Sequence, residues 1–345
     1  MTTTMQVVPT SQQQSNKFKK MMYQIFTRAP VPPGVKQPPI CFELGQDLPQ
    51  DLRGKIKIEK GHVGRGGYGK VFKGIYKQAR GKKITVAIKF LEIQSGPNMA
   101  AKVAEYLRRE TLVWGRLKHP HILDLIGICS GLDNPMSHVP ALVSPYCPHG
   151  NLSQYLEGKP PIQRLPLASQ VASAVHYIHA KDIIHGDIKP ENILIDEHGR
   201  PLLCDFGRSR IVGVDGFDTT LTSSQHYTAP ELLSYEDDIV PLTKPSDIFS
   251  LTITLLRIVT DLRPFHPRKG PVIIGLFLEG KAPVPVAGYA KCEEMSQDLW
   301  DLFDKGWSYN PTNRPNADEY VQELNSIPSR PKRPLQIVSQ AGDSR

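Results

Sequence analysis

The chain has 345 residues, of which 39% are hydrophobic and 22% are charged, as in an ordinary globular protein with one large core or two smaller ones. Its formal net charge of +8 is concentrated near the ends, where residues 1–54 and residues 326–345 each contribute +3. This distribution argues against a nucleic-acid-binding face, and we interpret the end segments as solvated tails.

The five cysteines are scattered along the chain, at Cys41, Cys129, Cys147, Cys204 and Cys292. None belongs to a Cys-x-x-Cys pair or has a histidine at zinc-finger spacing, so we expect reduced thiols in a cytoplasmic or nuclear protein. The N-terminus is polar and lacks the apolar core of a signal peptide. No apolar run approaches the ~20 residues of a membrane helix, so no membrane partner is expected.

The first 45 residues have the composition of a disordered tail. Pro30–Pro39 holds five prolines in ten positions, which excludes a regular helix there. An alternative for Asn16–Phe26 is a short amphipathic helix that docks elsewhere, but disorder is the better interpretation. Residues 329–345 resemble a second tail.

The first structured part of the chain is rich in strands. Alternation of apolar and polar residues predicts strands over Ile56–Ile58, Val71–Tyr76, Ile84–Lys89, Ile122–Cys129 and Ala141–Ser144. One helix, from about Asn98 to Leu117, interrupts them after Pro97.

The second part has helical periodicity. We expect helices at Asn151–Leu156, Leu165–Ala180, Pro245–Thr260, Gln297–Gly306 and Asn316–Leu324. Strands followed by helices predict an α+β protein with two lobes.

A glycine-rich segment joins the first two predicted strands. It reads Gly64-Arg65-Gly66-Gly67-Tyr68-Gly69-Lys70-Val71, and its glycines would let backbone N–H groups approach phosphates. Dinucleotide-binding folds use a similar pattern, but there a helix follows the glycines. Here a strand follows, which favours a hairpin that covers a nucleotide.

Lys89 ends the strand Val86-Ala87-Ile88-Lys89. On a half-buried strand, Ala87 and Lys89 would share one face, where the small Ala87 leaves room for a flat base and Lys89 reaches phosphates. Seen alone, Lys89 would be an ordinary edge-strand lysine in solvent, but the glycine-rich segment favours the binding role.

The segment His185-Gly186-Asp187-Ile188-Lys189-Pro190-Glu191-Asn192 is followed by Asp205-Phe206-Gly207. Two carboxylates and an amide at this spacing can hold magnesium and orient a hydroxyl for attack on a phosphate. Together with the glycine-rich segment and Lys89, this block resembles the catalytic loop and metal-binding loop of the eukaryotic protein kinases.

The resemblance covers residues 55–328 and implies a bilobal fold, with an N-lobe over about 55–145 and a C-lobe over about 146–328. It implies ATP and Mg²⁺ as cofactors, with Asp187 as catalytic base, Lys189 neutralising the transferred phosphoryl group, and Asn192 and Asp205 as metal ligands. Tyr146–Leu156 and Trp300–Arg314 are most similar to the tyrosine-kinase-like branch. The Asp-Phe-Gly-Arg-Ser-Arg sequence is similar to kinases of mushroom-forming fungi.

Further nucleotide-site residues are implied by the same resemblance. Glu110 would pair with Lys89, in preference to the other helix carboxylate, Glu105. Ser144–Cys147 would form the hinge that holds adenine, because Pro145 keeps its carbonyl and Cys147 keeps its N–H. The remaining implied contacts are Val63 and Leu194.

Other residues have structural roles in the resemblance. Glu231 would pair with Arg314, Asp247 would brace the catalytic loop, and Ser224 would contact the catalytic aspartate and lysine. Cys204 is interpreted as a buried hydrophobe, with a reactive thiol at the nucleotide site as the alternative.

Gly186 departs from the family pattern, which has arginine between the histidine and the aspartate. That arginine pairs with a phosphate in the activation segment, and glycine cannot form the pair. We therefore expect activity that does not require phosphorylation of the acceptor hydroxyls at Thr219, Thr220, Thr222 or Ser223.

The leading hypothesis is an active Ser/Thr protein kinase, whose partners are ATP and a protein with a Ser or Thr acceptor. The alternative is a pseudokinase that binds ATP and acts as a scaffold, supported by Gly186 and Pro145. Nucleic-acid binding through the tails is a third and weaker hypothesis.

Overall fold

The computed structural model describes residues 49–66, 69–91, 99–132, 140–159, 163–212, 225–233, 240–328 and 333–337. The predicted tail over 1–45 lies outside these ranges. So do the candidate acceptors Thr219, Thr220, Thr222 and Ser223, and Ser224, which was predicted to contact the catalytic residues. The chain divides into two compact units. Unit 1 comprises Met1–Gly115 and Leu125–Ser144, and unit 2 comprises Arg116–Asp124 and Pro145–Arg345.

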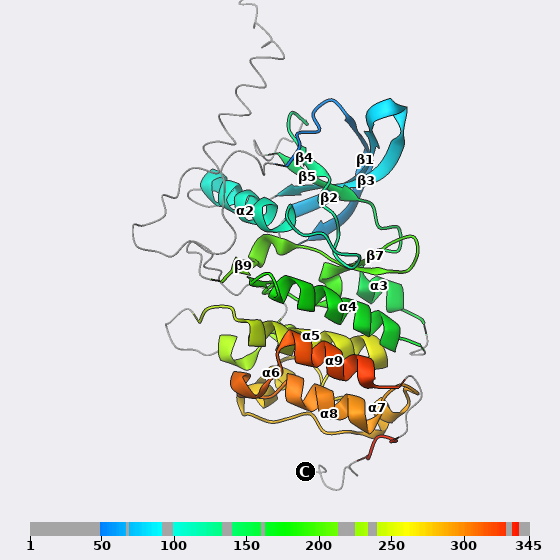
Figure 1. Ribbon diagram of the computed structural model, residues 1–345, viewed down its shortest axis with the longest axis vertical. Helices are drawn as coiled ribbons and strands as arrows, with labels where there is room; N and C mark the ends of the chain where they lie inside the picture. Colours follow the sequence, from blue (N-terminus) through cyan, green and yellow to red (C-terminus); the bar gives the residue numbers. More distant parts are fainter. Residues whose placement is uncertain are drawn as a thin grey trace, which may run out of the picture. The chain divides into compact units, whose positions relative to one another are not determined.

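Unit 1 is built on a five-stranded sheet (Figure 1). The strand order is β1-β2-β3-β5-β4, and the strands span, in that order, Ile56–Gly66, Gly69–Lys77, Lys83–Leu91, Ala141–Pro145 and Gly127–Cys129. β1 and β2 form an antiparallel hairpin in which Gly66 lies opposite Gly69. One helix, α2 (Met99–Trp114), belongs to the same unit. A strand therefore follows the glycines, as predicted.

The two faces of β3 differ as the alternation predicts. Val86 and Ile88 are fully buried in an apolar cluster that also contains Leu52 and Val143. Ala87 and Lys89 are only half-buried, and successive side chains of a strand point to opposite faces. Apolar burial of one face fixes the strand register, because a shift by one residue would expose Val86 and Ile88.

Two predicted elements are shorter than expected. Helix α2 ends at Trp114 rather than Leu117, and the residue that follows it is Gly115, which has a low helix propensity. The strand predicted over 122–129 is limited to β4 (Gly127–Cys129). Its first residues pair elsewhere: the N–H of Leu123 donates to the carbonyl of Leu203 at 3.0 Å.

Unit 2 contains the remaining helices of the described chain (Figure 1). These are α3 (Leu152–Leu156), α4 (Leu165–His179), α5 (Lys244–Thr260), α6 (Pro271–Leu278), α7 (Ala287–Ala290), α8 (Gln297–Gly306) and α9 (Ala317–Ser326). Most begin at polar capping residues, which satisfy backbone N–H groups of the first turn. Helix α5 starts one residue earlier than predicted, because Thr243 and Ser246 form a reciprocal capping box.

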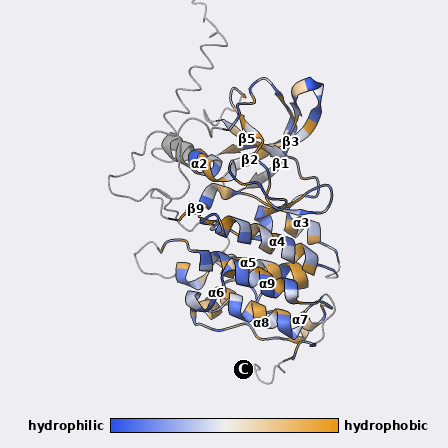
Figure 2. Ribbon diagram, in the orientation of Figure 1, coloured by the Kyte–Doolittle hydropathy of each residue, from blue (hydrophilic) through white to orange (hydrophobic). Residues whose placement is uncertain are grey.

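Helix α5 is the centre of this unit. It packs against α4 and α8, and α4 also packs against α9. The side chains of α5 are buried along nearly its whole length, including Asp247 in its first turn. In Figure 2, hydrophobic and hydrophilic bands alternate along α8 and α9, as expected for helices with one buried and one exposed face.

Two small antiparallel sheets carry the loops that follow α4. β6 (Ile183–Ile184) pairs with β9 (Arg210–Ile211), and β7 (Ile193–Ile195) pairs with β8 (Pro201–Leu203). Single 3₁₀ turns, η2 (Pro190–Asn192) and η3 (Phe206–Arg208), lie within the same stretch. The sequence did not predict these strands or helices α6 and α7, because two or three residues show no periodicity and α6 is apolar on all sides.

The segment Arg333–Ile337 contacts the start of α8. Pro334 forms a β-bridge with Ser296, and the N–H of Gln336 donates to Gln297 Oε1 at 3.0 Å. Leu335 is buried. The domain end predicted at residue 328 stays a prediction, but part of the following segment is held against unit 2.

The predicted α+β class is confirmed by the strand-rich unit 1 and the helical unit 2. Within the residues that the structure describes, no helix combines the length and the apolar character needed to span a bilayer.

Candidate active site

Asp247 organises the loop between β6 and η2. Its carboxylate accepts the N–H of His185 at 2.7 Å, the N–H of Gly186 at 2.8 Å and His179 Nε2 at 2.9 Å. Asp247 is only 1% exposed. A buried carboxylate with three donors holds its partners in one geometry, so Asp247 fixes the backbone immediately before Asp187. This is the bracing role that was predicted from sequence.

The Asp187 carboxylate lies at the centre of the loop, with its side chain 8% exposed. Oδ2 accepts hydrogen bonds from Lys189 Nζ at 2.8 Å and from Asn192 Nδ2 at 2.9 Å. The other oxygen, Oδ1, lies 3.6 Å from Nη1 of Arg208. Two cations and one amide thus surround the carboxylate. The structure brings together the three residues Asp187, Lys189 and Asn192, as the sequence predicted.

Asn192 and Asp205 lie at one end of the β7–β8 hairpin. The N–H of Cys204 donates to the carbonyl of Asn192 at 2.9 Å, which places the residue before Asp205 beside Asn192. Because the Asn192 amide nitrogen donates to Asp187, its oxygen is the atom that a magnesium ion would take. An amide oxygen and a carboxylate are the hard donors that Mg²⁺ prefers, so this pair fits the predicted metal.

His185 supports the loop as a neutral residue. Its side chain is fully buried, and burial lowers the pKa of the imidazole despite the nearby carboxylate of Asp247. Nδ1 accepts the N–H of Asp187 at 3.2 Å, and Nε2 lies 3.0 Å from the carbonyl of Cys204. These contacts require the tautomer with its proton on Nε2.

In unit 1, Lys89 Nζ donates to Glu110 Oε1 at 2.9 Å. The Glu110 side chain is fully buried and the Lys89 side chain is 18% exposed. The predicted contact is therefore present, because β3 and α2 carry the two charges to the same place. Val71 lies opposite Lys89 in the β2–β3 ladder and Ala87 precedes it by two residues, so the three share one face of the sheet.

The structure explains why glycine is required at one position of the glycine-rich segment. A side chain at Gly69 would collide with the carbonyl of Phe90, so the close approach of β3 already requires glycine there. Gly64 has no such constraint beyond an ordinary contact with Val71. Gly67 and Tyr68 lie outside the described residues. The phosphate-binding role of this segment stays a prediction.

A family model of the protein kinase domain matches residues 58–324, which is most of the chain. The chain belongs to the protein kinase family. This kinase domain is 28% identical to the serine/threonine-protein kinase STY17 of Arabidopsis thaliana over 299 residues, which cover 84% of the chain and 48% of that relative. It is 30% identical over 270 residues to the probable serine/threonine-protein kinase kinX of Dictyostelium discoideum, covering 77% of the chain and 23% of the relative.

The chain is also 28% identical to the serine/threonine/tyrosine-protein kinase HT1 of Arabidopsis thaliana. That match extends over 285 residues, which cover 80% of the chain and 67% of HT1. The chain thus spans about half the length of STY17 and a quarter of kinX.

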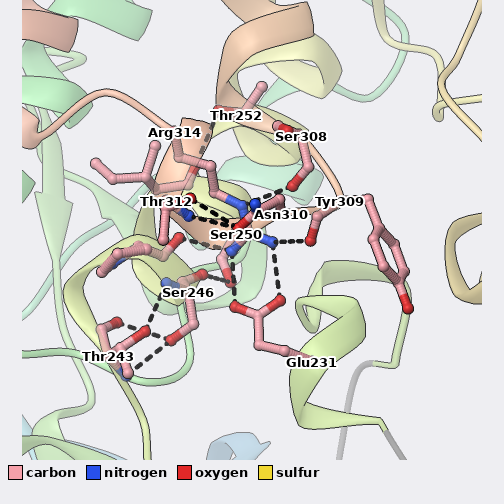
Figure 3. Close-up of polar contacts among 12 residues, drawn as sticks. Glu231, Thr243, Ser246, Ser250, Thr252, Ser308, Tyr309, Asn310, Thr312 and Arg314 are labelled. Carbon is pink, nitrogen blue, oxygen red and sulfur yellow. Dashed lines mark hydrogen bonds and ion pairs between the residues drawn. The ribbon is translucent and has the colours of Figure 1, made fainter. Parts of the chain in front are cut away.

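An ion pair with a buried arginine joins two parts of the kinase domain (Figure 3). Arg314 Nη1 and Nη2 contact Glu231 Oε1 and Oε2 at 2.7 and 2.8 Å, and Arg314 Nε donates to the carbonyl of Ser308 at 2.9 Å. The Arg314 side chain is fully buried. The predicted pairing is present and has the bidentate geometry that Arg–carboxylate pairs favour.

The predicted adenine-binding residues lie at the end of β5 and just after it. Cys147 is buried, and burial raises the pKa of its thiol to about 12. The thiol therefore stays protonated, and a structural role suits it. Leu194 is half-buried in β7, Ser144 is buried in β5, and Val63 is exposed in β1. Their contacts with a nucleotide stay predictions.

Sequence reasoning missed Arg208, which ends the turn η3 directly after Asp205-Phe206-Gly207. An arginine in a short loop would ordinarily be placed in solvent, yet this residue is 2% exposed. The sequence contained one signal for this role. Gly186 lacks the arginine of the family pattern, and an arginine occurs at Arg208, in a different part of the sequence.

Proposed function

We propose that this chain is a serine/threonine protein kinase that transfers the γ-phosphoryl group of Mg-ATP to a hydroxyl of a protein substrate. The observation that carries the proposal is the shared contact of Lys189 and Asn192 with one oxygen of Asp187. A base, a cation and a metal-ligand amide joined in this way match the requirements of phosphoryl transfer.

In this proposal each residue has one task. Asp187 orients the acceptor hydroxyl and takes its proton, and Lys189 stabilises negative charge on the transferred phosphoryl group. Asn192 and Asp205 would hold magnesium, which neutralises the phosphate oxygens when bound. Lys89, held by Glu110, would position the α- and β-phosphates.

The choice of Ser or Thr as acceptor rests on two supports. Lys189, two residues after the catalytic aspartate, follows the serine/threonine pattern, and STY17 and kinX carry serine/threonine in their names. HT1 is also named for tyrosine, so the assay must include all three acceptors. A cytoplasmic or nuclear location remains part of this proposal.

The test compares the wild-type chain with Asp187→Asn and Lys89→Met in Mg-ATP, using peptide libraries with Ser, Thr or Tyr as the acceptor. We expect transfer to Ser and Thr peptides, and a fall of kcat by about 10²- to 10⁴-fold in Asp187→Asn because the base is lost. Asp196→Asn is a suitable control, since Asp196 pairs with the exposed Arg200 rather than with the loop. Equal rates in wild type and Asp187→Asn would refute the proposal, and Mg-ATP binding without transfer would favour the pseudokinase alternative.

A further inference from the structure

The backbone of Arg208 lies against Gly186. An ideal Cβ built on Gly186 would lie 3.2 Å from the backbone carbonyl of Arg208 and would collide with a methyl group of Leu242. Gly186 also has φ +75°, where residues with a side chain are strained. The absence of a side chain at 186 thus lets the η3 turn approach the catalytic loop closely.

Two further contacts hold Arg208 against the loop. Ser209 Oγ donates to the carbonyl of His185 at 3.3 Å. The next residues, Arg210 and Ile211, pair as β9 with the strand β6 that leads into the loop. Because the three residues after Arg208 are held against the loop and β6, the backbone of Arg208 has little freedom to move.

The side chain of Arg208 places a permanent charge beside the catalytic carboxylate. Nη1 lies 3.6 Å from Asp187 Oδ1, and the side chains of Arg208 and Asp187 are 3% and 8% exposed. At this burial an ion pair is weakly screened by solvent and salt. Lys189 and Asn192 hold Oδ2, and Arg208 places a cation at the other oxygen.

We propose that Arg208 is a positioning residue for Asp187. It supplies cationic support from within the fold and needs no phosphate on the activation segment. This inference rests on the proposed kinase function and deepens it. The charge of Arg208 is always present, so the orientation of Asp187 does not wait for a modification. The glycine at 186 and the arginine at 208 form a compensating pair.

The test measures kcat and both KM values, for ATP and for an acceptor peptide, in the full chain with Mg-ATP. Arg208→Leu should lower kcat by about 10- to 100-fold, the cost of a misplaced reacting group, with both KM values near those of wild type. Arg208→Lys should recover part of the loss, because it restores the charge without the planar fork. The matched control is Arg210→Leu, which removes an arginine from the same segment whose Nη1 contacts the carbonyl of Leu242 at 3.4 Å; its kcat should stay close to wild type.

Thermal melting with and without Mg-ATP shows whether each variant is folded. If Arg208→Leu does not fold, Arg208→Gln replaces it, and Arg208→Lys must then be faster than Arg208→Gln. Unchanged or increased kcat in the uncharged variant, equal rates for the lysine and uncharged variants, or an equal loss in Arg210→Leu would each overturn the proposal. A wild-type chain that transfers no phosphate would overturn the proposed function itself, whereas an active wild type with an equally active Arg208→Leu would overturn this inference alone.

Discussion

The Arg314 guanidinium makes a bidentate contact with the Glu231 carboxylate across 83 positions of the chain. It also donates to the backbone carbonyls of Ser308 and Pro245. Because Arg314 is fully buried, its charge has little access to water and depends on these partners. The pair joins the residues that follow the activation segment to the loop before α9.

Removing one partner of this pair should destabilise the kinase domain strongly. We expect Glu231→Gln to lower the free energy of unfolding by about 3–5 kcal/mol, because a buried guanidinium loses its counter-ion. Urea unfolding measures the change. Asp298→Asn is the control, since Asp298 pairs with Arg333, which is 59% exposed, and such surface pairs contribute about 0–1 kcal/mol. Similar losses in the two variants would show that burial does not set the strength of the Arg314 pair.

A side chain at Gly186 should destabilise the kinase domain. Gly186→Ala forces alanine into a left-handed conformation, at a cost of about 1–2 kcal/mol, and drives its methyl group into Leu242. Gly158→Ala tests the backbone part alone, since Gly158 has φ +71° and no atom lies within 4 Å of the position that its methyl group would take. Chemical denaturation should show the larger loss at Gly186, and Leu242→Ala should relieve part of it. Equal losses at the two glycines would exclude the collision as a cause.

Activity should not depend on phosphorylation of the activation segment. Gly186 cannot bind a phosphate on Thr219, Thr220, Thr222 or Ser223, and Arg208 already lies beside Asp187. Phosphatase treatment of the purified chain should therefore leave the initial rate of peptide phosphorylation largely unchanged. Replacing the four hydroxyl residues with alanine serves as a second measurement, and a collapse of the rate in either experiment would contradict the expectation.

Stability should fall as the pH drops below about 6.5. Burial lowers the pKa of His185 in the folded state from 6.5, so in this range the unfolded chain binds a proton that the folded chain does not. The pKa values of His119 and His121 are lowered in the same direction, also mainly by burial. Each such histidine can contribute a slope of up to about 1.4 kcal/mol per pH unit between its two pKa values.

Urea unfolding at pH 7 and pH 5.5 measures this slope. His185→Gln should reduce it, because the variant has no group to titrate at this position. His198→Gln should not, since the His198 side chain is 64% exposed. A slope that is unchanged in His185→Gln would contradict the assignment.

Much of the candidate site could be predicted because its residues belong to short, ordered patterns. Lys89 and Glu110 meet at 2.9 Å, and Lys189 and Asn192 contact Asp187, as the spacing and the family resemblance implied. Asp187, Lys189 and Asn192 lie within five positions of each other in one loop, so the chain itself keeps their side chains close. The element boundaries were less predictable: α2 ends at Trp114, before Gly115, and the start of the strand predicted at Ile122 pairs with β8 instead of β5.

The sequence alone determined that a strand-rich part precedes a helical part, which face of β3 is buried, and the chemical identity of the groups that can handle phosphate and magnesium. These follow from periodicity and residue type, which are local properties. Only the tertiary structure decided that Arg208 is buried beside Asp187 and that Leu242 and the Arg208 carbonyl crowd the position that a side chain at Gly186 would take. Those facts depend on residues 21 to 56 positions apart packing at one point, and no local pattern encodes such contacts.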